Sequence, residues 1–275
     1  METIQAFVLG IVQGLTEFLP VSSSGHLVLG QHFFGLTEPE LLFDISLHIG
    51  TLLAVVVVFF KDIVAIFTAL ARLPKLSAAA GGWRPVVSQN EQVRTALLIV
   101  AGSVPTAVIG LGFHRVADRI FASVPIVGMM LLVTGGLLWA TRTRSSGSRT
   151  VAGMTVKAAL IIGLMQGFAI LPGISRSGAT ISTALFLGVE RATAGRFSFL
   201  LSLPAIVGAL LLELRSGAAS SASVPVLLLG GTVAAVTGWI ALVLLLRIVK
   251  SGHLHRFAPY CWALGAAVLV WRFAM

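Results

Sequence analysis

Charged residues are scarce in this sequence, and so are cysteines. Only 11% of the 275 residues are charged, while 57% are hydrophobic and the mean hydropathy is +0.99. An average soluble domain carries about 25% charged residues, so the composition excludes such a domain and indicates a surface that mostly faces lipid. The single cysteine, Cys261, excludes an internal disulfide and fits no metal-ligand spacing.

Common nucleotide and metal motifs are also missing. The chain has no G-x-x-x-x-G-K-[ST] loop and no His, Cys or Asp cluster at the spacing of a structural metal site. The net charge of +9 would suggest a nucleic-acid partner in a soluble protein. In so hydrophobic a chain, basic residues instead hold the topology and meet anionic headgroups. The expected partners are therefore membrane lipids and not nucleic acid.

Long apolar runs dominate the rest of the sequence. A run of about 20 residues crosses the roughly 30 Å of hydrocarbon in a bilayer. Six runs come close to that length: 41–60, 94–112, 124–140, 197–213, 224–247 and 258–274. Two more apolar regions, 3–34 and 156–189, are interrupted by LPVSSSG and LPGISRSG. Their halves, about 15 residues each, are short for a crossing, so each is expected to form a helix–loop–helix around a protected polar cavity.

The two interrupted regions resemble each other. GIVQGLTEFLPVSSSG (10–25) and GLMQGFAILPGISRSG (163–178) share G-x-x-Q-G, a Leu-Pro displaced by one position, and S-x-S-G. Each is followed by a full apolar span, from Phe43 and from Phe197. We therefore predict a single membrane domain with an internal repeat of roughly 150 residues. Repeat one covers about 1–140 and repeat two about 150–275.

Basic residues orient the two repeats. They gather in three segments that we expect to be loops and that the positive-inside tendency places in the cytoplasm: 61–94, 141–157 and 247–256. Segments 113–123 and 214–223 then lie outside, although Arg115 and Arg119 argue mildly against this. The expected fold is an all-α integral membrane protein with six transmembrane helices and two re-entrant helix–loop–helix regions. Because these regions enter from opposite sides, they form an inverted-topology repeat whose polar tips meet near the midplane.

The first interruption carries an acid and an imidazole. Gln13 and Glu17 lie four residues apart, so they share one face of a helix. A carboxylate at membrane depth is costly unless it is paired or faces water. Glu17 is therefore a candidate catalytic group, with a reach toward the headgroups as the alternative. His26 can act as acid, base or nucleophile near neutral pH, with a packed, hydrogen-bonded histidine as the alternative.

Both interruptions are rich in groups that bind anions. Their small polar residues are Ser22, Ser23, Ser24 and Gly25 in the first, and Ser175, Ser177, Gly178 and Thr180 in the second. A tight turn of this composition before a helix can bind an anion through its N–H groups and the helix dipole. Serines also simply cap helices. We take these residues, together with Gln13, as candidates for the binding of substrate.

The second interruption adds a fixed positive charge. Arg176 lies between two serines at membrane depth, with no acidic residue nearby in the sequence. A guanidinium matches phosphate oxygens bidentately and is costly to bury without an anion. A salt bridge to Glu17 across the repeat is the alternative, and the two roles can alternate. Asp44 and His48, four residues apart at the start of a span, are expected to pair with each other or with headgroups.

These residues are similar to the signatures of a known family. QGLTEFLPVSSSGHL and LPGISRSGAT resemble the two signature segments of the bacitracin-resistance type of undecaprenyl-diphosphate phosphatase. LHIGTLLAV and FSFLLSLPAIVGA resemble that family too, so the likeness runs through nearly the whole chain. The family often has two acids, E-x-x-x-E, where this chain has Gln13 and Glu17. Glutamine is allowed at the first position, but Gln13 cannot act as a base.

The resemblance implies a function. Members of the family remove the terminal phosphate from the C55 isoprenoid diphosphate and so regenerate the monophosphate carrier lipid for peptidoglycan synthesis. It implies a bacterial inner-membrane protein whose active site opens toward the periplasm. By motif position, Ser23 and His26 are the candidates for the nucleophile and its partner, and Arg176 is the candidate diphosphate clamp. The choice between serine and histidine as nucleophile stays open.

The expected chemistry follows from the charge of a diphosphate. Its cleavage requires neutralisation of the transferred phosphoryl group and an in-line nucleophile. We expect Ser23 or His26 to attack while Arg176 and backbone N–H groups hold the oxygens, and His26, oriented by Glu17, to act as base or acid. A divalent cation, Mg²⁺ or Ca²⁺, held by Glu17 and the diphosphate is also expected, because one arginine does not offset a diphosphate.

Three other functions fit these residues less well. A membrane transporter or lipid flippase with a midplane anion site shares the inverted repeat, but it does not require the set Glu17, Ser23 and His26. The type-2 phosphatidic-acid phosphatases have a segment that resembles SSSGH, but they need a histidine at the position that Ser182 occupies here. A purely structural bundle would leave Arg176 buried without a purpose. The glycine-lined helices are compatible with a homodimer.

Overall fold

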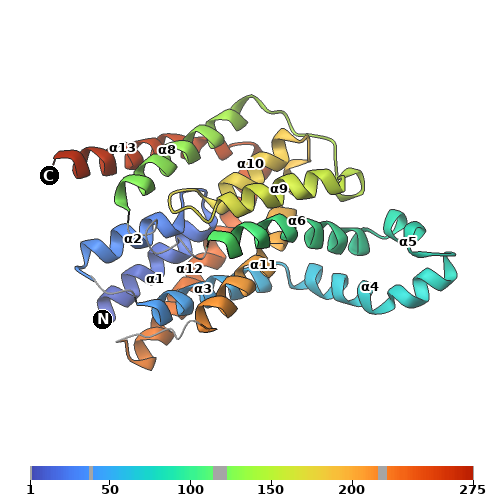
Figure 1. The fold of residues 1–275 in the computed structure, drawn as a ribbon, viewed down its shortest axis with the longest axis horizontal. Coiled ribbons are helices and arrows are strands. Elements are labelled where there is room, and N and C mark those ends of the chain that lie inside the picture. Colours follow the sequence, from blue (N-terminus) through green and yellow to red (C-terminus); the bar gives the residue numbers. More distant parts are fainter. Residues whose placement is uncertain (1, 37–39, 114–122, 216–221, 275) are drawn as a thin grey trace.

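The structure is helical throughout the residues that it describes. The computed structural model covers residues 2–36, 40–113, 123–215 and 222–274. These residues form twelve α-helices and no strand beyond one isolated bridge, which confirms the all-α prediction for them (Figure 1). The helices are α1 (Thr3–Phe18), α2 (Ser23–Phe33), α3 (Leu41–Val58), α4 (Phe60–Ala79), α5 (Trp83–Gln89), α6 (Glu91–Phe113), α8 (Val124–Ala140), α9 (Val156–Phe168), α10 (Arg176–Phe186), α11 (Arg191–Arg215), α12 (Val224–Ser251) and α13 (Ala258–Ala274).

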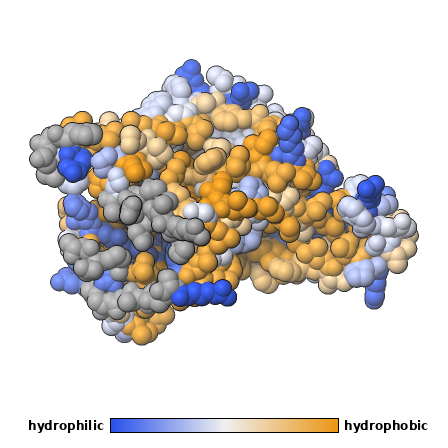
Figure 2. All heavy atoms as spheres, viewed as in Figure 1, coloured by the Kyte–Doolittle hydropathy of each residue, from blue (hydrophilic) through white to orange (hydrophobic). Residues whose placement is uncertain are grey.

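The long helices have the dimensions of membrane spans. Five of those described, α3, α6, α8, α11 and α12, are long and apolar enough to cross a bilayer. The sixth expected span is α13, whose 17 residues are at the short end of crossing lengths. Hydrophobic side chains cover most of the face in Figure 2, and hydrophilic residues lie mainly at its margins. The chain is therefore an α-helical, multi-pass membrane protein.

Segment 61–94 differs from the expected loop. It forms α4 and α5, which extend together with the start of α6 to one side of the bundle in Figure 1. Ala69 of α4, Val86 of α5 and Val93 of α6 pack into a small core of their own. The basic residues of this segment indicated a loop, but Ala69, Leu73 and Leu76 of α4 recur at helical spacing and all contribute to this small core.

The short helices α1 and α9 each pack against the other half of the chain. α1 lies along α12, where a β-carbon on Gly10 would be 2.8 Å from the carbonyl oxygen of Gly230. α9 lies along α6, where a β-carbon on Gly163 would collide with the carbonyl group of Gly102. Small residues allow this close approach of helix backbones, and the sequence has glycines four residues apart in both helices, at Gly10 and Gly14 and at Gly163 and Gly167.

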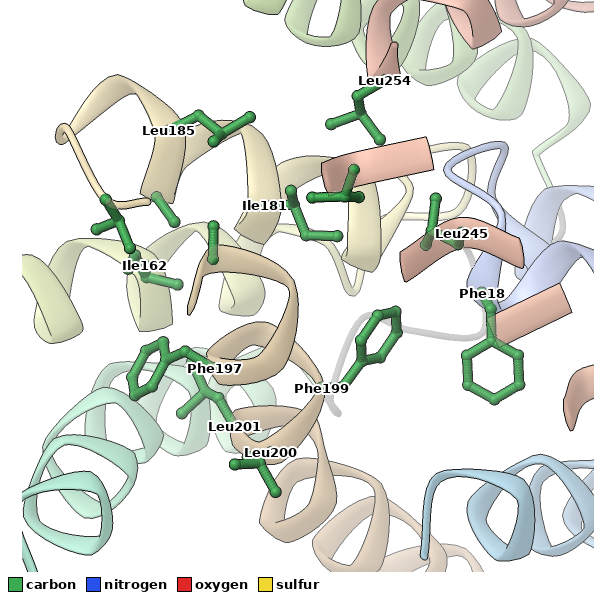
Figure 3. Packing of buried hydrophobic residues seen from close by; sticks show 14 of the residues in the cluster. Phe18, Ile162, Ile181, Leu185, Phe197, Phe199, Leu200, Leu201, Leu245 and Leu254 are labelled. Atoms are coloured by element: carbon green, nitrogen blue, oxygen red, sulfur yellow. The ribbon is translucent and has the colours of Figure 1, made fainter. Parts of the chain in front are cut away.

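The interruptions lie about half-way along the long helices. Gly14, one turn before the first interruption, faces Thr237 near the middle of α12. Thr134, in the second half of α8, donates a hydrogen bond to the carbonyl oxygen of Gly173 in the second interruption at 2.8 Å. The rings of Phe18 and Phe199 meet edge to face at 5.8 Å beside the first interruption (Figure 3). Both interruptions are therefore enclosed by protein.

The three basic segments meet at one end of the bundle. Arg94 donates to the carbonyl oxygen of Val151 at 3.0 Å, and Arg191 donates to that of Arg144 at 3.1 Å. The guanidinium of Arg191 also lies against Gly252. The segments 113–123 and 214–223, expected on the other side, fall largely outside the described residues, as do Arg115 and Arg119.

Candidate active site at the meeting of the two interruptions

The first interruption is a strained turn. Pro20 cannot continue α1, and Ser22 then takes φ of 70°, a conformation that costs a residue with a side chain about 1–3 kcal/mol. The Ser22 hydroxyl caps α2 by accepting from the N–H of Gly25 at 3.4 Å. It also accepts from the N–H of Gly173 at 3.0 Å. The second interruption thus holds the first in its strained shape.

The second interruption is built in the same way. Ser175 caps α10 by accepting from the N–H of Gly178 at 3.1 Å, and its own N–H donates to Thr134 Oγ1. Gly173 has φ of 99°, and a β-carbon there would collide with α8. Ser177 donates to the carbonyl oxygen of Phe18, at the end of α1, at 2.8 Å. The hydrogen bonds from Gly173 to Ser22 and from Ser177 to Phe18 therefore join the two regions, and both are buried.

Glu17 lies at the centre of the site. Its Oε1 accepts from Arg176 Nη2 at 2.9 Å, across 159 positions of sequence. Its Oε2 accepts from Ser23 Oγ at 2.6 Å and from Gln13 Nε2 at 3.1 Å. The Glu17 side chain is only 5% exposed, whereas that of Arg176 is 28% exposed. The salt bridge weighed as an alternative role of Arg176 therefore exists, and the guanidinium still has an accessible part.

His48 joins this site, which the sequence reasoning did not expect. Its Nδ1 lies 3.2 Å from Gln13 Nε2 and 3.9 Å from Glu17 Oε2. Asp44, its expected partner, accepts a hydrogen bond from Gln31 at 2.8 Å. An amide N–H₂ group can only donate, so Gln13 bridges Glu17 and the unprotonated Nδ1 of His48. The available signal was a polar residue about two turns inside an apolar span.

His26 contacts a different group from the one expected. Its Nδ1 lies 2.8 Å from the carbonyl oxygen of Ser22, and its Nε2 lies 2.7 Å from the hydroxyl of Tyr260 on α13. The sequence predicted that Glu17 would orient His26. Glu17 is instead bonded to Ser23, so the serine and the histidine of the first interruption are engaged by separate groups. Tyr260 is a residue that the sequence reasoning missed.

The remaining candidates differ in how free they are to bind a ligand. Ser22, Ser175 and Ser177 are buried and used in the hydrogen bonds between or within the interruptions, and Thr180 donates to the carbonyl oxygen of Arg176 at 2.8 Å. Ser24 is partly exposed and shares a hydrogen bond with Ser22. Gly25 and Gly178 supply the N–H groups that cap α2 and α10. A cleft beside the ion pair is lined by Glu17, Phe18, Arg176, Ser177, Thr180, Ser198, Phe199, Ser202 and Ile206.

A cation would have few protein ligands here. Among the described residues, no group of three or more His, Cys, Asp or Glu side chains could hold a metal ion. Glu17 is the carboxylate of the site, and the buried Oε1 of Gln13 has no hydrogen-bond partner among the described residues. Mg²⁺ is usually bound through one or two carboxylates together with substrate phosphates. The side chains therefore fit a cation that substrate oxygens largely hold.

Fold and site together define a class of protein. It is a multi-pass membrane protein in which two broken helix pairs bring a carboxylate, a hydroxyl, an imidazole and a guanidinium into one enclosed polar site. The family model described as Bacitracin resistance protein BacA matches residues 6–267, and the chain belongs to that family.

Similar proteins cover the chain almost completely. It is 53% identical to an undecaprenyl-diphosphatase of Desulforapulum autotrophicum, over 98% of both chains. It is 56% identical to an undecaprenyl-diphosphatase of Desulfosudis oleivorans, over 98% of both chains. A third undecaprenyl-diphosphatase, from Desulfatibacillum aliphaticivorans, is 54% identical over 99% of this chain and 100% of its own length.

Proposed function

We propose that this chain hydrolyses undecaprenyl diphosphate to undecaprenyl phosphate and inorganic phosphate. Membership of the bacitracin-resistance family and the names of relatives that align over nearly the full length support this activity. It would recycle the carrier lipid for peptidoglycan synthesis and confer resistance to bacitracin. The observation that carries the proposal is the chain of contacts from Ser23 through Glu17 to Arg176, because it couples a nucleophile, a base and a phosphate-binding cation.

Ser23 acts as the nucleophile in this proposal. Its Oγ attacks the terminal phosphorus, and its proton passes to Glu17 Oε2, 2.6 Å away. The P–O bond to the bridging oxygen breaks, and undecaprenyl phosphate leaves with that oxygen. Water then hydrolyses the phosphoserine and releases inorganic phosphate. His26 fits the nucleophile role less well, because both of its ring nitrogens are engaged by Ser22 and Tyr260.

Arg176 stabilises the charge of the transferred group. In the resting site it pairs with Glu17, but protonation of Glu17 by Ser23 removes the negative charge from its partner. The guanidinium is then free to hold two phosphoryl oxygens in its planar fork. Backbone N–H groups at the start of α2 and α10 add partial positive charge. A Mg²⁺ or Ca²⁺ ion held by the diphosphate, with Glu17 as a ligand until it takes the proton of Ser23, would supply further neutralisation.

The proposed topology has six crossings and two re-entrant pairs. The ends of the second pair support this: α9 begins beside Met154, to which Arg94 donates, and the chain after α10 bonds to Arg149, so both ends lie among the basic segments. The open end of α1–α2 packs instead near the start of α12, at Val226 and Leu227. We place the basic end in the cytoplasm, so that α1–α2 and the active site open to the periplasm of a bacterial inner membrane.

The proposed inverted repeat has matching contacts in its two halves. Thr106 of α6 donates to the carbonyl oxygen of Gly163 at 2.8 Å, and Thr237 of α12 donates to that of Gly10 at 3.5 Å. Gly10 and Gly163 occupy equivalent places in the repeated segments. Each short helix therefore uses the same glycine against a threonine of the opposite half. A homodimer stays a prediction, which light scattering in detergent would test.

Phosphate release from undecaprenyl diphosphate by the purified protein tests the activity. We expect release by the wild type and a loss of at least about 10³-fold in Ser23→Ala, because removal of a nucleophile leaves only binding and charge stabilisation. Substrate labelled in its terminal phosphate, quenched during turnover, would place the label on Ser23. Label on His26 would overturn the choice of nucleophile. No release by the wild type, with lipid movement between leaflets instead, would favour a transporter or flippase.

A further inference from the structure

Tyr260 reaches the proposed active site from the far end of the chain. It is the single tyrosine of the sequence and lies in the first turn of α13. Its hydroxyl is 2.7 Å from His26 Nε2, and the two rings lie nearly parallel, with 5.8 Å between centroids and 9° between planes. A hydrogen bond thus joins two nearly parallel rings across 234 positions of sequence.

The hydrogen bonds of His26 fix the place of its exchangeable proton. A carbonyl oxygen can only accept, so the Nδ1 that faces the Ser22 carbonyl carries a hydrogen. In the neutral ring, Nε2 therefore has the lone pair and accepts from Tyr260. In the charged ring, Nε2–H donates to the tyrosine oxygen. In both states the Tyr260 hydroxyl contacts the one ring nitrogen of His26 that can gain or lose a proton.

The protein holds Tyr260 firmly at this place. Its neighbour Cys261 is buried and donates to the carbonyl oxygen of Pro20, in the first interruption, at 3.5 Å. Trp262 donates to the carbonyl oxygen of Leu132 in α8 at 3.2 Å. The start of α13 is thus anchored both to the interruption that carries His26 and to a long helix. Tyr260 itself is 49% exposed, so this anchoring does not bury it.

We propose that Tyr260 is a positioning residue for His26, and this rests on the phosphatase activity proposed above. Its hydroxyl holds the imidazole with Nδ1 on the Ser22 carbonyl and keeps Nε2 as the ring nitrogen that exchanges a proton. Tyr260 acts through His26 and makes no covalent bond. Placement of this residue on a rigid helix rather than on a loop suits that task.

The test separates the hydroxyl from the ring. Tyr260→Phe keeps the aromatic ring and removes only the hydrogen bond. We expect kcat to fall about tenfold, the effect of one lost hydrogen bond, with KM changed less than about twofold and the melting temperature unchanged. In a His26→Ala background, the same substitution should have no further effect, because the group that it positions is gone.

A second histidine–aromatic pair serves as the control. His32 and Trp271 also join α2 to α13, edge to face at 5.4 Å between centroids. Trp271→Phe should leave kcat unchanged if the first pair acts through its hydrogen bond. Wild-type kcat in Tyr260→Phe would overturn the proposal, as would equal losses in Tyr260→Phe and Trp271→Phe, or a full further loss in the His26→Ala background.

Nitrogen NMR of labelled histidine gives a readout that does not depend on turnover. The wild type should show His26 with its proton on Nδ1, and Tyr260→Phe should shift the Nε2 signal. His26→Ala identifies the signal among those of the six histidines. The absence of such a shift would overturn the proposed contact. A shift in a protein that releases no phosphate would instead mean that the contact exists and that the proposed activity is wrong.

Discussion

Arg176→Ala would leave the Glu17 carboxylate, whose side chain is 5% exposed, without its guanidinium partner. Removal of one member of a buried ion pair costs about 3–5 kcal/mol. Glu17 would keep its hydrogen bonds from Ser23 and Gln13, and Arg176 itself is 28% exposed. We therefore expect a smaller loss in the free energy of unfolding, about 2 kcal/mol. For a chain of this size that lowers the melting temperature by roughly 4 °C.

The same substitution should affect the reaction far more than the fold. An arginine that stabilises a transferred phosphoryl group contributes about 10³–10⁵ in rate. The N-termini of α2 and α10 remain in the variant, so we expect the lower limit, a loss of about 10³, which corresponds to about 4 kcal/mol of transition-state stabilisation. Phosphate release from undecaprenyl diphosphate, measured at substrate concentrations above and below KM, would give this value.

A double variant distinguishes the two roles of the pair. In Arg176→Ala with Glu17→Gln, no unpaired charge is buried, so the melting temperature should return toward that of the wild type while activity stays absent. A rate for Arg176→Ala within tenfold of the wild type would refute the role of Arg176 in phosphoryl transfer. A melting temperature that Glu17→Gln does not restore would refute the electrostatic account of its loss.

Three further predictions concern the surroundings of Glu17 and the packing of the repeats. Gln13→Glu would put a second carboxylate about 3 Å from that of Glu17. Because the two negative charges repel each other, phosphate release should depend more steeply on added Mg²⁺ or Ca²⁺. An unchanged dependence on the cation would contradict this. His48→Leu removes the acceptor for Gln13 and should lower the rate about fivefold, whereas a wild-type rate would make His48 a packing residue. Gly163→Val should lower the free energy of unfolding by about 1–3 kcal/mol through overpacking, and so lower the melting temperature. Gly136→Val is the control, because a β-carbon there would meet open space. Equal melting temperatures of the two variants would refute the tight contact between α9 and α6.

The interruptions were predictable because their chemistry conflicts with their surroundings. A carboxylate and a guanidinium within apolar runs are costly to bury unless they pair with each other or with a ligand. The likeness between the two segments then suggested that Glu17 and Arg176 share one site, and the structure places them 2.9 Å apart. The roles of these residues in catalysis stay predictions, as does the boundary between the repeats.

The missed residues have no such signal. Tyr260 and His48 are polar residues in helices that are mostly apolar, and such a residue is equally compatible with packing or with headgroup contact. Their partners depend on how helices distant in sequence pack together, as α13 does near the first interruption and α3 near α1. The helices α4 and α5 were missed for a different reason, because their basic residues outweighed an apolar stripe at helical spacing.

The charges of the site explain why both interruptions are needed. Glu17 and Arg176 cancel in the resting state, so the attraction for a diphosphate comes first from the N-termini of α2 and α10, each equivalent to about half a positive charge. Ser23 and Arg176 are the first residues of those two helices. When Ser23 gives its proton to Glu17, the cancellation ends and the full charge of Arg176 becomes available as the phosphoryl group is transferred. Either interruption alone would have a base without a cation or a cation without a base, and only their contact at Glu17 couples proton transfer to charge stabilisation.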